Sequence, residues 1–239
     1  MQRDPSDRRR FGHLALALAA GAAAALAVLP GPAAATPGAP GGDDSPVATV
    51  DLAALQLTPA ETGPIVKWPS DPPLDLSVYK TQTHPVGGAS GTSDPQCATA
   101  VYAGLDSTYN GSGYTGLNYQ ELTGFGSKNS YSVISVVSSY DSEHTAANMV
   151  ANTIQKWTDC NRKKVTGDVT GATETRTVNN VVATLEDIYL VNNVADNGAC
   201  SHAMSSQDNV VVEVSACRTN IGLVKQGLQL ANKMLIKLP

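Results

Sequence analysis

The sequence predicts an α+β domain in which helices pack against an antiparallel sheet. Segments that alternate apolar and polar residues, as half-buried strands do, follow one another with mostly short turns between them. Helical patterns lie at both ends of the folded region. Aromatic residues make up only 5% of the chain, while threonine, serine, asparagine and valine are frequent. These features are typical of a β-containing secreted domain of the α+β class.

The first 35 residues have the pattern of an export signal. An arginine-bearing start is followed by an apolar run, Leu14–Leu29, and by small residues that end at Ala35. We therefore predict a signal peptide over residues 1–35. Arg8–Phe11 also fits a twin-arginine signal, so the export route stays open. The apolar run of about 16 residues is marginal for a spanning helix, and an uncleaved anchor is the alternative.

The mature chain is predicted to be a linker, residues 36–52, followed by a folded domain, residues 53–239. The linker is rich in proline, glycine and acidic residues, a composition typical of a flexible tether. Removing the signal's four arginines and two aspartates leaves a net charge of −7. This balance argues against a nucleic-acid partner and against electrostatic attachment to an anionic membrane. We expect a secreted or cell-wall-associated protein with no stable membrane span after signal cleavage.

The first ordered element is a short helix that begins after Thr58. Thr58 suits the N-cap, Pro59 the first helical position, and Glu61 completes a capping box. Gly63 and Pro64 then keep this helix short. The elements that follow are a strand over 74–82, a brief helix from Asp94-Pro95 to Gly104, strands over 115–123 and 131–140, and two strands within 174–192.

Two longer helices are expected, one after the 131–140 strand and one at the end of the chain. Asp141 or Ser142 can cap the first. Its buried stripe consists of Ala146, Met149, Val150, Thr153, Ile154 and Trp157, and its polar side of His144, Asn148, Asn152 and Gln155. The last helix is predicted from about Ile221, with a buried face of Val224, Leu228, Ala231 and Leu235 and with Lys233 and Lys237 near its C-terminal dipole.

The stretch ACSHAMSSQDNVVVEVSAC, residues 199–217, predicts a β-hairpin. With Asp208-Asn209 as a two-residue loop, Cys200 lies directly opposite Cys217. Counting outward from the loop makes them a non-hydrogen-bonded pair, whose close spacing suits a disulfide. One face of the hairpin then carries Val210, Val212, Val214 and Ala216, packed under helices. The cysteine face carries His202, Met204, Glu213 and Ser215.

The four cysteines are expected to form two structural disulfides. All four lie in the exported part of the chain, where the compartment is oxidising. They form no C-x-x-C pair and have no nearby His-x-x-x-His, so zinc and thioredoxin-like interpretations are poor. With Cys200 paired to Cys217, the remaining two join Cys97 to Cys160. We therefore expect no metal and no cofactor.

Four segments resemble the PknH-like extracellular sensor domain family of actinobacteria. They are LTPAE near the start, CATAVYAG (97–104), QKWTDC (155–160) and DNVVVEVSAC (208–217). The resemblance extends from about Ala53 to Leu238, and its specific part is the cysteine frame with Trp157 three residues before Cys160. It implies the same two disulfides and a twisted antiparallel sheet with helices around a solvent-filled cleft that receives a ligand. It implies no catalytic residues. The chain departs from the kinase members by an insertion around LDSTYNGSGYTG (105–116).

Sequence motifs for catalysis or nucleotide binding are weak. GSGYTG, residues 111–116, matches G-x-G-x-x-G but lacks the strand before it and the long helix after it that a dinucleotide site requires. His84 and His144 are expected to be solvated. Glu186 and Asp187 are adjacent in a strand, and therefore point to opposite faces.

The most plausible polar constellation is His202 with Glu213 and Ser215 across the hairpin, and these three are our candidate cleft residues. A serine hydrolase needs a nucleophile, a base and an orienting acid in mutual reach, and flat cross-strand neighbours rarely provide this. A polar surface or cleft wall is therefore the preferred interpretation. We expect a non-enzymatic, sensor-type ligand-binding domain for an unidentified small molecule or cell-envelope component. The alternatives are a secreted hydrolase of the cell envelope and a structural envelope protein.

Overall fold

The computed structural model describes residues 51–69, 71–88, 91–169, 172–179, 181–184, 187–220 and 225–239. The predicted signal peptide, most of the linker, Glu186 and the predicted start of the last helix, 221–224, lie outside these ranges. Within them, no helix has both the length and the apolar character needed to cross a membrane.

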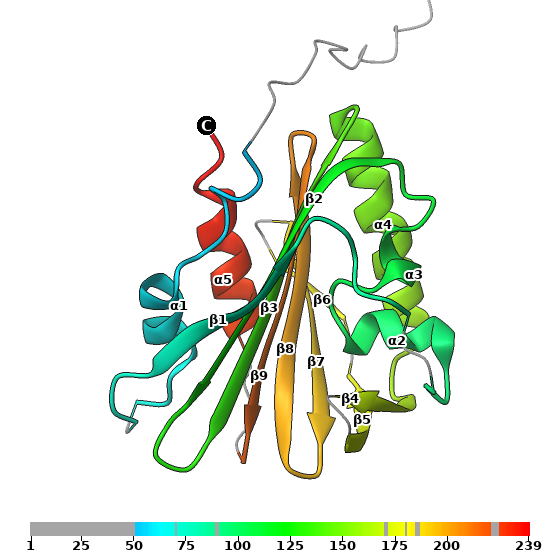
Figure 1. The fold of residues 1–239 in the computed structure, drawn as a ribbon. Coiled ribbons are helices and arrows are strands. Elements are labelled where there is room, and N and C mark those ends of the chain that lie inside the picture. Colours follow the sequence, from blue (N-terminus) through cyan, green and yellow to red (C-terminus); the bar gives the residue numbers. More distant parts are fainter. Residues whose placement is uncertain are drawn as a thin grey trace, which may run out of the picture. The chain divides into compact units, whose positions relative to one another are not determined.

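The core of the fold is an antiparallel sheet (Figure 1). The nine strands within the described ranges are β1 (Asp75–Gln82), β2 (Tyr114–Phe125), β3 (Ser130–Tyr140), β4 (Lys164–Val169), β5 (Ala172–Val178), β6 (Val182–Ala183), β7 (Tyr189–Ala195), β8 (Gly198–Gln207) and β9 (Val210–Thr219). Eight of them follow the order β1-β2-β3-β9-β8-β7-β5-β4, and β6 pairs with β7. The predicted α+β class with a twisted antiparallel sheet is confirmed, and β4 is a strand that the sequence patterns had not indicated.

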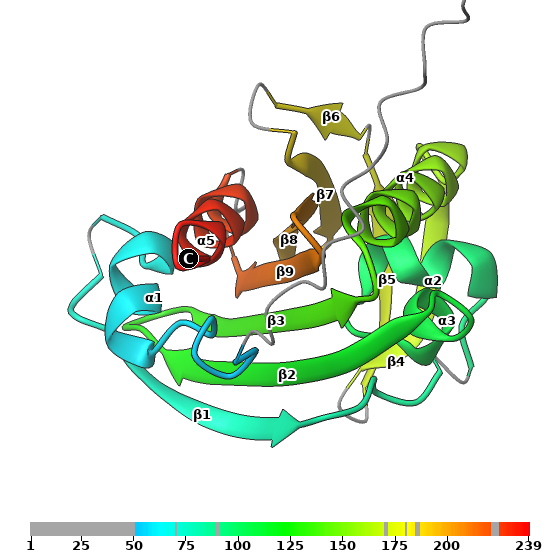
Figure 2. The same ribbon diagram turned by 90° about the horizontal axis from the view of Figure 1, so that it is seen from above.

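Helices cover both faces of the sheet (Figure 2). They are α1 (Pro59–Val66), α2 (Pro95–Val101), α3 (Asp106–Tyr109), α4 (Glu143–Asp159) and α5 (Gln226–Leu235). α1 and α5 share one hydrophobic core with the sheet, while α2, α3 and α4 share the other. Because successive residues of a strand point to opposite faces, β9 contributes Val212 to the first core and Val211 to the second.

The central hairpin of β8 and β9 has the predicted register. Gln207 pairs with Val210, and Cys200 pairs with Cys217. Asp208 adopts the positive φ of 51° that a tight turn requires. The face formed by Val210, Val212, Val214 and Ala216 is fully buried beside α5, as expected.

The two disulfides also form as predicted. Cys97 in α2 is bonded to Cys160 at the end of α4, and Cys200 in β8 is bonded to Cys217 in β9. The first bridge ties together two helices that cover the same face of the sheet. The second joins two neighbouring interior strands.

Local signals place the N-termini of α1, α2 and α4 correctly. Thr58 and Glu61 form the predicted capping box of α1. This helix continues two residues beyond Pro64, so Gly63-Pro64 lies inside the helix and does not end it. Ser142 caps α4, whose buried residues are the six that its apolar spacing predicted. α2 ends at Val101, before the predicted Gly104, because Tyr102 turns to an extended conformation.

The buried face of the last helix matches the prediction at Ala231 and Leu235 but is centred differently from the predicted one. The buried residues of its described part are Gly227, Leu230, Ala231, Met234 and Leu235, while Leu228 is only partly buried. Gly227 lies so close to β8 that a Cβ atom there would be 2.4 Å from the Ser201 carbonyl oxygen. This close approach rotates the helix so that Gly227, and not Leu228, faces the sheet.

Candidate ligand-binding cleft

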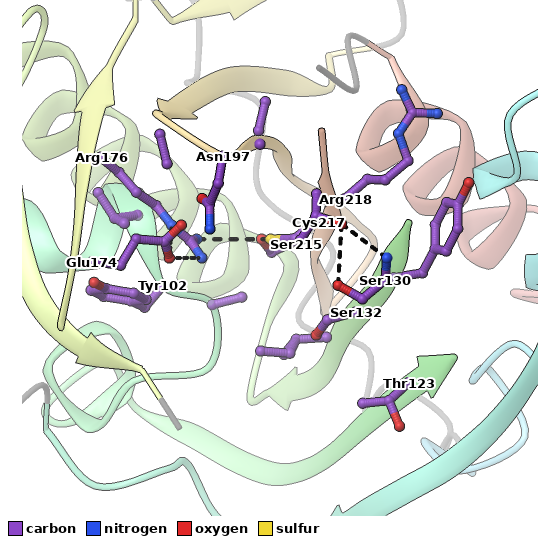
Figure 3. A pocket seen from close by; sticks show the side chains of 18 of the residues that line it. Tyr102, Thr123, Ser130, Ser132, Glu174, Arg176, Asn197, Ser215, Cys217 and Arg218 are labelled. Carbon is purple, nitrogen blue, oxygen red and sulfur yellow. Dashed lines mark hydrogen bonds and ion pairs between the residues drawn. The ribbon is translucent and has the colours of Figure 1, made fainter. Parts of the chain in front are cut away.

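A cavity of about 520 Å³ lies on the α2–α4 side of the sheet. Its floor consists of alternate residues of β2, β3 and β9, because residues opposed across an antiparallel ladder share a face. Thr123 is opposed to Ser132, which in turn is opposed to Cys217. The cleft-lining residues labelled in Figure 3 are Tyr102, Thr123, Ser130, Ser132, Glu174, Arg176, Asn197, Ser215, Cys217 and Arg218.

Hydroxyl groups dominate the polar part of the floor. They come from Thr123 of β2, Ser130 and Ser132 of β3, and Ser215 and Thr219 of β9. Ile134 and Phe125 add apolar surface, and 76% of Phe125 is exposed. The floor therefore offers several neutral hydrogen-bonding groups next to apolar patches.

The wall of the cleft is formed by Arg176, Glu174 and Tyr102. Arg176 donates from Nε and Nη2 to Oε2 of Glu174, at 2.9 and 2.7 Å. Its guanidinium lies 5.4 Å from the ring centre of Tyr102, a cation–π arrangement. Burial raises the pKa of Tyr102, although the charge of Arg176 opposes this effect. The Tyr102 side chain is therefore neutral at physiological pH.

Arg176 also contacts the disulfide in the cleft. Its Nη1 lies 2.9 Å from Sγ of Cys200. The same atom lies 3.8 Å from Sγ of Cys217, which Figure 3 shows beside Ser215. The second arginine of the lining, Arg218, follows Cys217 in β9, so its side chain points to the opposite face of the sheet. There its guanidinium lies 4.6 Å from the ring centre of Trp68. Among the described residues that line the cleft, Arg176 is therefore the arginine whose guanidinium lies on the cleft face.

A buried polar network lies behind the cleft. Glu213 of β9 accepts hydrogen bonds at Oε2 from the Tyr109 hydroxyl, at 2.7 Å, and from the Gly104 backbone, at 2.9 Å. Its Oε1 is 2.9 Å from Nε2 of His202. Nδ1 of His202 lies 3.1 Å from the carbonyl oxygen of Ala100, which can only accept, so Nδ1 carries a proton. The network fastens the α2–α3 segment to the centre of the sheet.

The three candidate cleft residues lie side by side on the hairpin, where His202 is opposed to Ser215, but they do not share one environment. His202 and Glu213 are in contact, but both are 0% exposed and neither lines the cavity. The α2–α3 segment covers them, and the Trp157 ring lies 4.3 Å from that of His202. They therefore do not form the polar surface or cleft wall expected from the sequence. Ser215 does line the cavity, and its hydroxyl lies 3.7 Å from Sγ of Cys217.

The remaining motifs lie away from the cleft. Gly111 and Gly113 belong to the turn between α3 and β2, so a strand follows the GSGYTG motif where a nucleotide site would need a helix. His84 and His144 are exposed, as predicted. Within the described part of the chain, no group of three or more His, Cys, Asp or Glu side chains is arranged to hold a metal ion.

Sequence reasoning missed the wall of the cleft. Glu174 and Arg176 are two residues apart in β5, a spacing that places opposite charges on one face of a strand. That spacing was a usable signal for an ion pair. It does not reveal that the pair stands over a disulfide 24 residues away from Arg176 in sequence.

The molecule is thus of the class of α+β domains with two disulfides and a cleft on one face of an antiparallel sheet. The chain belongs to the PknH-like extracellular domain family, whose model matches residues 47–237. It is similar to serine/threonine-protein kinase PknH of Mycobacterium bovis and of Mycobacterium tuberculosis, with 30% identity over 194 residues in each case. The matched region is 80% of this chain but only 31% and 30% of those proteins.

The fold is likewise similar to a solved structure. The crystal structure of the extracellular domain of PknH from Mycobacterium tuberculosis superposes with a TM-score of 0.69 and 28% sequence identity. The match covers 81% of this chain and 97% of that domain. The similarity therefore extends over nearly the whole of the extracellular domain, while the chain spans about 30% of the length of the kinases themselves.

Proposed function

We propose that the chain is a secreted, non-enzymatic, sensor-type domain that binds a small molecule or cell-envelope fragment in its cleft. The observation that carries the proposal is the cavity of about 520 Å³, which falls in the range of small-molecule sites. In this proposal residues 1–35 are the signal, 36–52 the linker and 53–239 the binding domain. Membership of an extracellular domain family supports placement outside the cell.

The charges of the lining favour an uncharged ligand. Arg176 is already paired with Glu174, and Glu121 adds a second carboxylate to the cleft. An anionic ligand would meet a site without net positive charge, whereas hydroxyl groups of a neutral ligand can pair with those of the floor. The exposed Phe125 ring adds an apolar surface for the face of a sugar ring. We therefore propose a neutral, hydroxyl-rich ligand, such as a saccharide fragment.

The burial of His202 supports a binding function over a hydrolase. A general base must come within hydrogen-bond reach of the group that it deprotonates in the substrate, directly or through one water. His202 is 0% exposed, and both of its ring nitrogens face protein oxygen atoms. Hydrolysis of ester or glycoside substrates that is lost in Ser215→Ala, with an unchanged melting temperature, would contradict the non-enzymatic proposal.

The test is a thermal-shift and NMR screen of the exported domain with neutral oligosaccharides and, in parallel, with sugar phosphates. A neutral saccharide is expected to raise the melting temperature, because a ligand that binds only the folded state stabilises it. Thr123→Trp would fill the cleft and abolish this shift. Thr81→Trp, an exposed site outside the cleft on the neighbouring strand, is the matched control. Preferential binding of the phosphates, or binding unaffected by Thr123→Trp, would overturn the proposal.

A further inference from the structure

The two sulfur atoms of the Cys200–Cys217 disulfide have different surroundings. Cys217 lines the cavity and is partly exposed, whereas Cys200 is 2% exposed and does not line it. The other disulfide is enclosed, since Cys97 is 0% and Cys160 2% exposed. A small molecule in the cleft can therefore reach Sγ of Cys217, while the other three sulfur atoms are covered.

The strand register also places the path of attack on Cys217 in the open cavity. A thiolate attacks a disulfide sulfur along the S–S axis, from the side opposite the leaving sulfur. Beyond Cys217 in that direction lies Ser132 of β3, which lines the cavity. Beyond Cys200 lies Asn193 of β7, which is 0% exposed and donates to the Ala100 carbonyl at 2.7 Å. In-line attack is thus possible at Cys217 and blocked at Cys200.

Arg176 stands beside the sulfur that would leave. Its Nη1 is 2.9 Å from Sγ of Cys200 but 3.8 Å from Sγ of Cys217. A neighbouring guanidinium favours a thiolate over a thiol, and a leaving thiol of lower pKa departs faster. The two contacts from Nε and Nη2 to Oε2 of Glu174 hold the guanidinium in this position. The accessible sulfur and the stabilised leaving sulfur are therefore different atoms of one bond.

We propose that Cys200–Cys217 is a thiol-exchange site for low-molecular-weight thiols that enter the cleft. The thiolate forms a bond to Sγ of Cys217, the Sγ–Sγ bond breaks, and its electron pair remains on Cys200 beside Arg176. A second thiolate then attacks the small-thiol sulfur of the mixed disulfide, which releases the small symmetric disulfide and the Cys217 thiolate. Two thiols are oxidised and one disulfide is reduced. This site does not depend on the saccharide ligand proposed above.

The experiment treats the exported protein with 2-mercaptoethanol, quenches with acid, blocks free thiols with N-ethylmaleimide and maps the peptides. We expect the 2-mercaptoethanol adduct on Cys217 and the maleimide on Cys200. Reduction of this bridge should be at least about tenfold faster than that of Cys97–Cys160. An adduct on Cys200, or equal rates for the two bridges, would overturn the proposal. No saccharide is present, so a failure of the ligand proposal leaves this result unaffected.

Two kinds of variant test the mechanism. Arg176→Met should slow exchange by about three- to tenfold, and Arg176→Lys should restore part of the rate. If Arg176→Met does not fold, Ser132→Trp provides a second test. It keeps both cysteines but blocks the line of attack, and it should also slow exchange. Thr81→Trp, outside the cleft, should leave the rate unchanged. Wild-type rates in folded Arg176→Met or in Ser132→Trp would contradict the assigned roles.

Discussion

The Tyr109 hydroxyl donates a hydrogen bond to Oε2 of Glu213 at 2.7 Å, although the two residues are 104 positions apart in the sequence. Both side chains are 0% exposed. Burial is the main reason that the pKa of Tyr109 is raised well above its ordinary value, so the hydroxyl keeps its proton and donates it. This contact fastens the short helix α3, and with it the segment that covers His202, to the middle of the sheet.

Tyr109→Phe should therefore destabilise the protein. The change leaves Oε2 of the buried Glu213 with only the Gly104 backbone as a donor, and losing a partner of a buried acceptor costs about 1–3 kcal/mol. Urea unfolding of the variant and the wild type measures the difference in the free energy of unfolding. Tyr79→Phe is the control, because 70% of Tyr79 is exposed, and it should change stability by less than about 0.5 kcal/mol. Equal stability of the two variants would show that the hydrogen bond from Tyr109 to Glu213 does not contribute to the free energy of unfolding.

The two disulfides should differ in their contribution to stability. The sequence separation is 63 for Cys97–Cys160 and 17 for Cys200–Cys217. Loop-closure entropy then predicts a loss of about 4 kcal/mol when the first bridge is removed and about 3 kcal/mol for the second. Nonreducing peptide mapping should recover these two pairs with no free thiol. The double Cys→Ser variant that lacks Cys97–Cys160 should have a lower free energy of unfolding than the one that lacks Cys200–Cys217. A melting temperature unchanged by both double variants would rule out a stabilising role.

Asp71 should make stability depend on pH in the acidic range. The hydrogen bond from the Tyr131 hydroxyl, followed by those from Asn129 and Ser127 and the charge of Arg218, lowers its pKa against the opposing effect of burial. A lowered pKa means that the folded state binds its proton less readily than the unfolded chain. The stability from Asp71 is then present above its ordinary pKa of 3.8 and is lost as the pH falls through the lower folded value.

The measurement is the free energy of unfolding from pH 6 to pH 2 for the wild type and for Asp71→Asn. The wild type should lose more stability below pH 3.8 than the variant, because asparagine does not titrate. The comparison uses the slope with pH, so a constant destabilisation by the substitution does not affect it. Parallel curves for the two proteins would contradict the assigned role of Asp71.

Expression in an actinobacterial host should release a mature protein that begins near Thr36. The arginine-bearing start, the apolar run and the small residues before position 36 match the pattern from which we predict a cleavable export signal. N-terminal sequencing of protein from the culture medium and the cell-wall fraction tests this. Full-length chain recovered from the membrane fraction would instead indicate an uncleaved anchor.

The sequence by itself determined the features that depend on neighbouring residues. The capping box of Thr58 and Glu61 and the buried stripe of α4 follow from helix geometry alone. The pairing of Cys200 with Cys217 follows from a two-residue turn and the two-residue period of a strand. Each of these rests on contacts within about twenty residues, where backbone geometry leaves few alternatives.

Only the tertiary structure decided what surrounds those features. The α2–α3 segment covers His202 and Glu213 through contacts that span more than 100 residues, such as the one between Ala100 and His202. β5 brings Arg176 to the disulfide, and the close approach of Gly227 to Ser201 sets the buried face of α5. The alternation of side chains along a strand determines which residues share a face. What covers that face depends on how distant segments pack. For this reason the candidate residues shared a face as predicted, while only Ser215 lines the cleft.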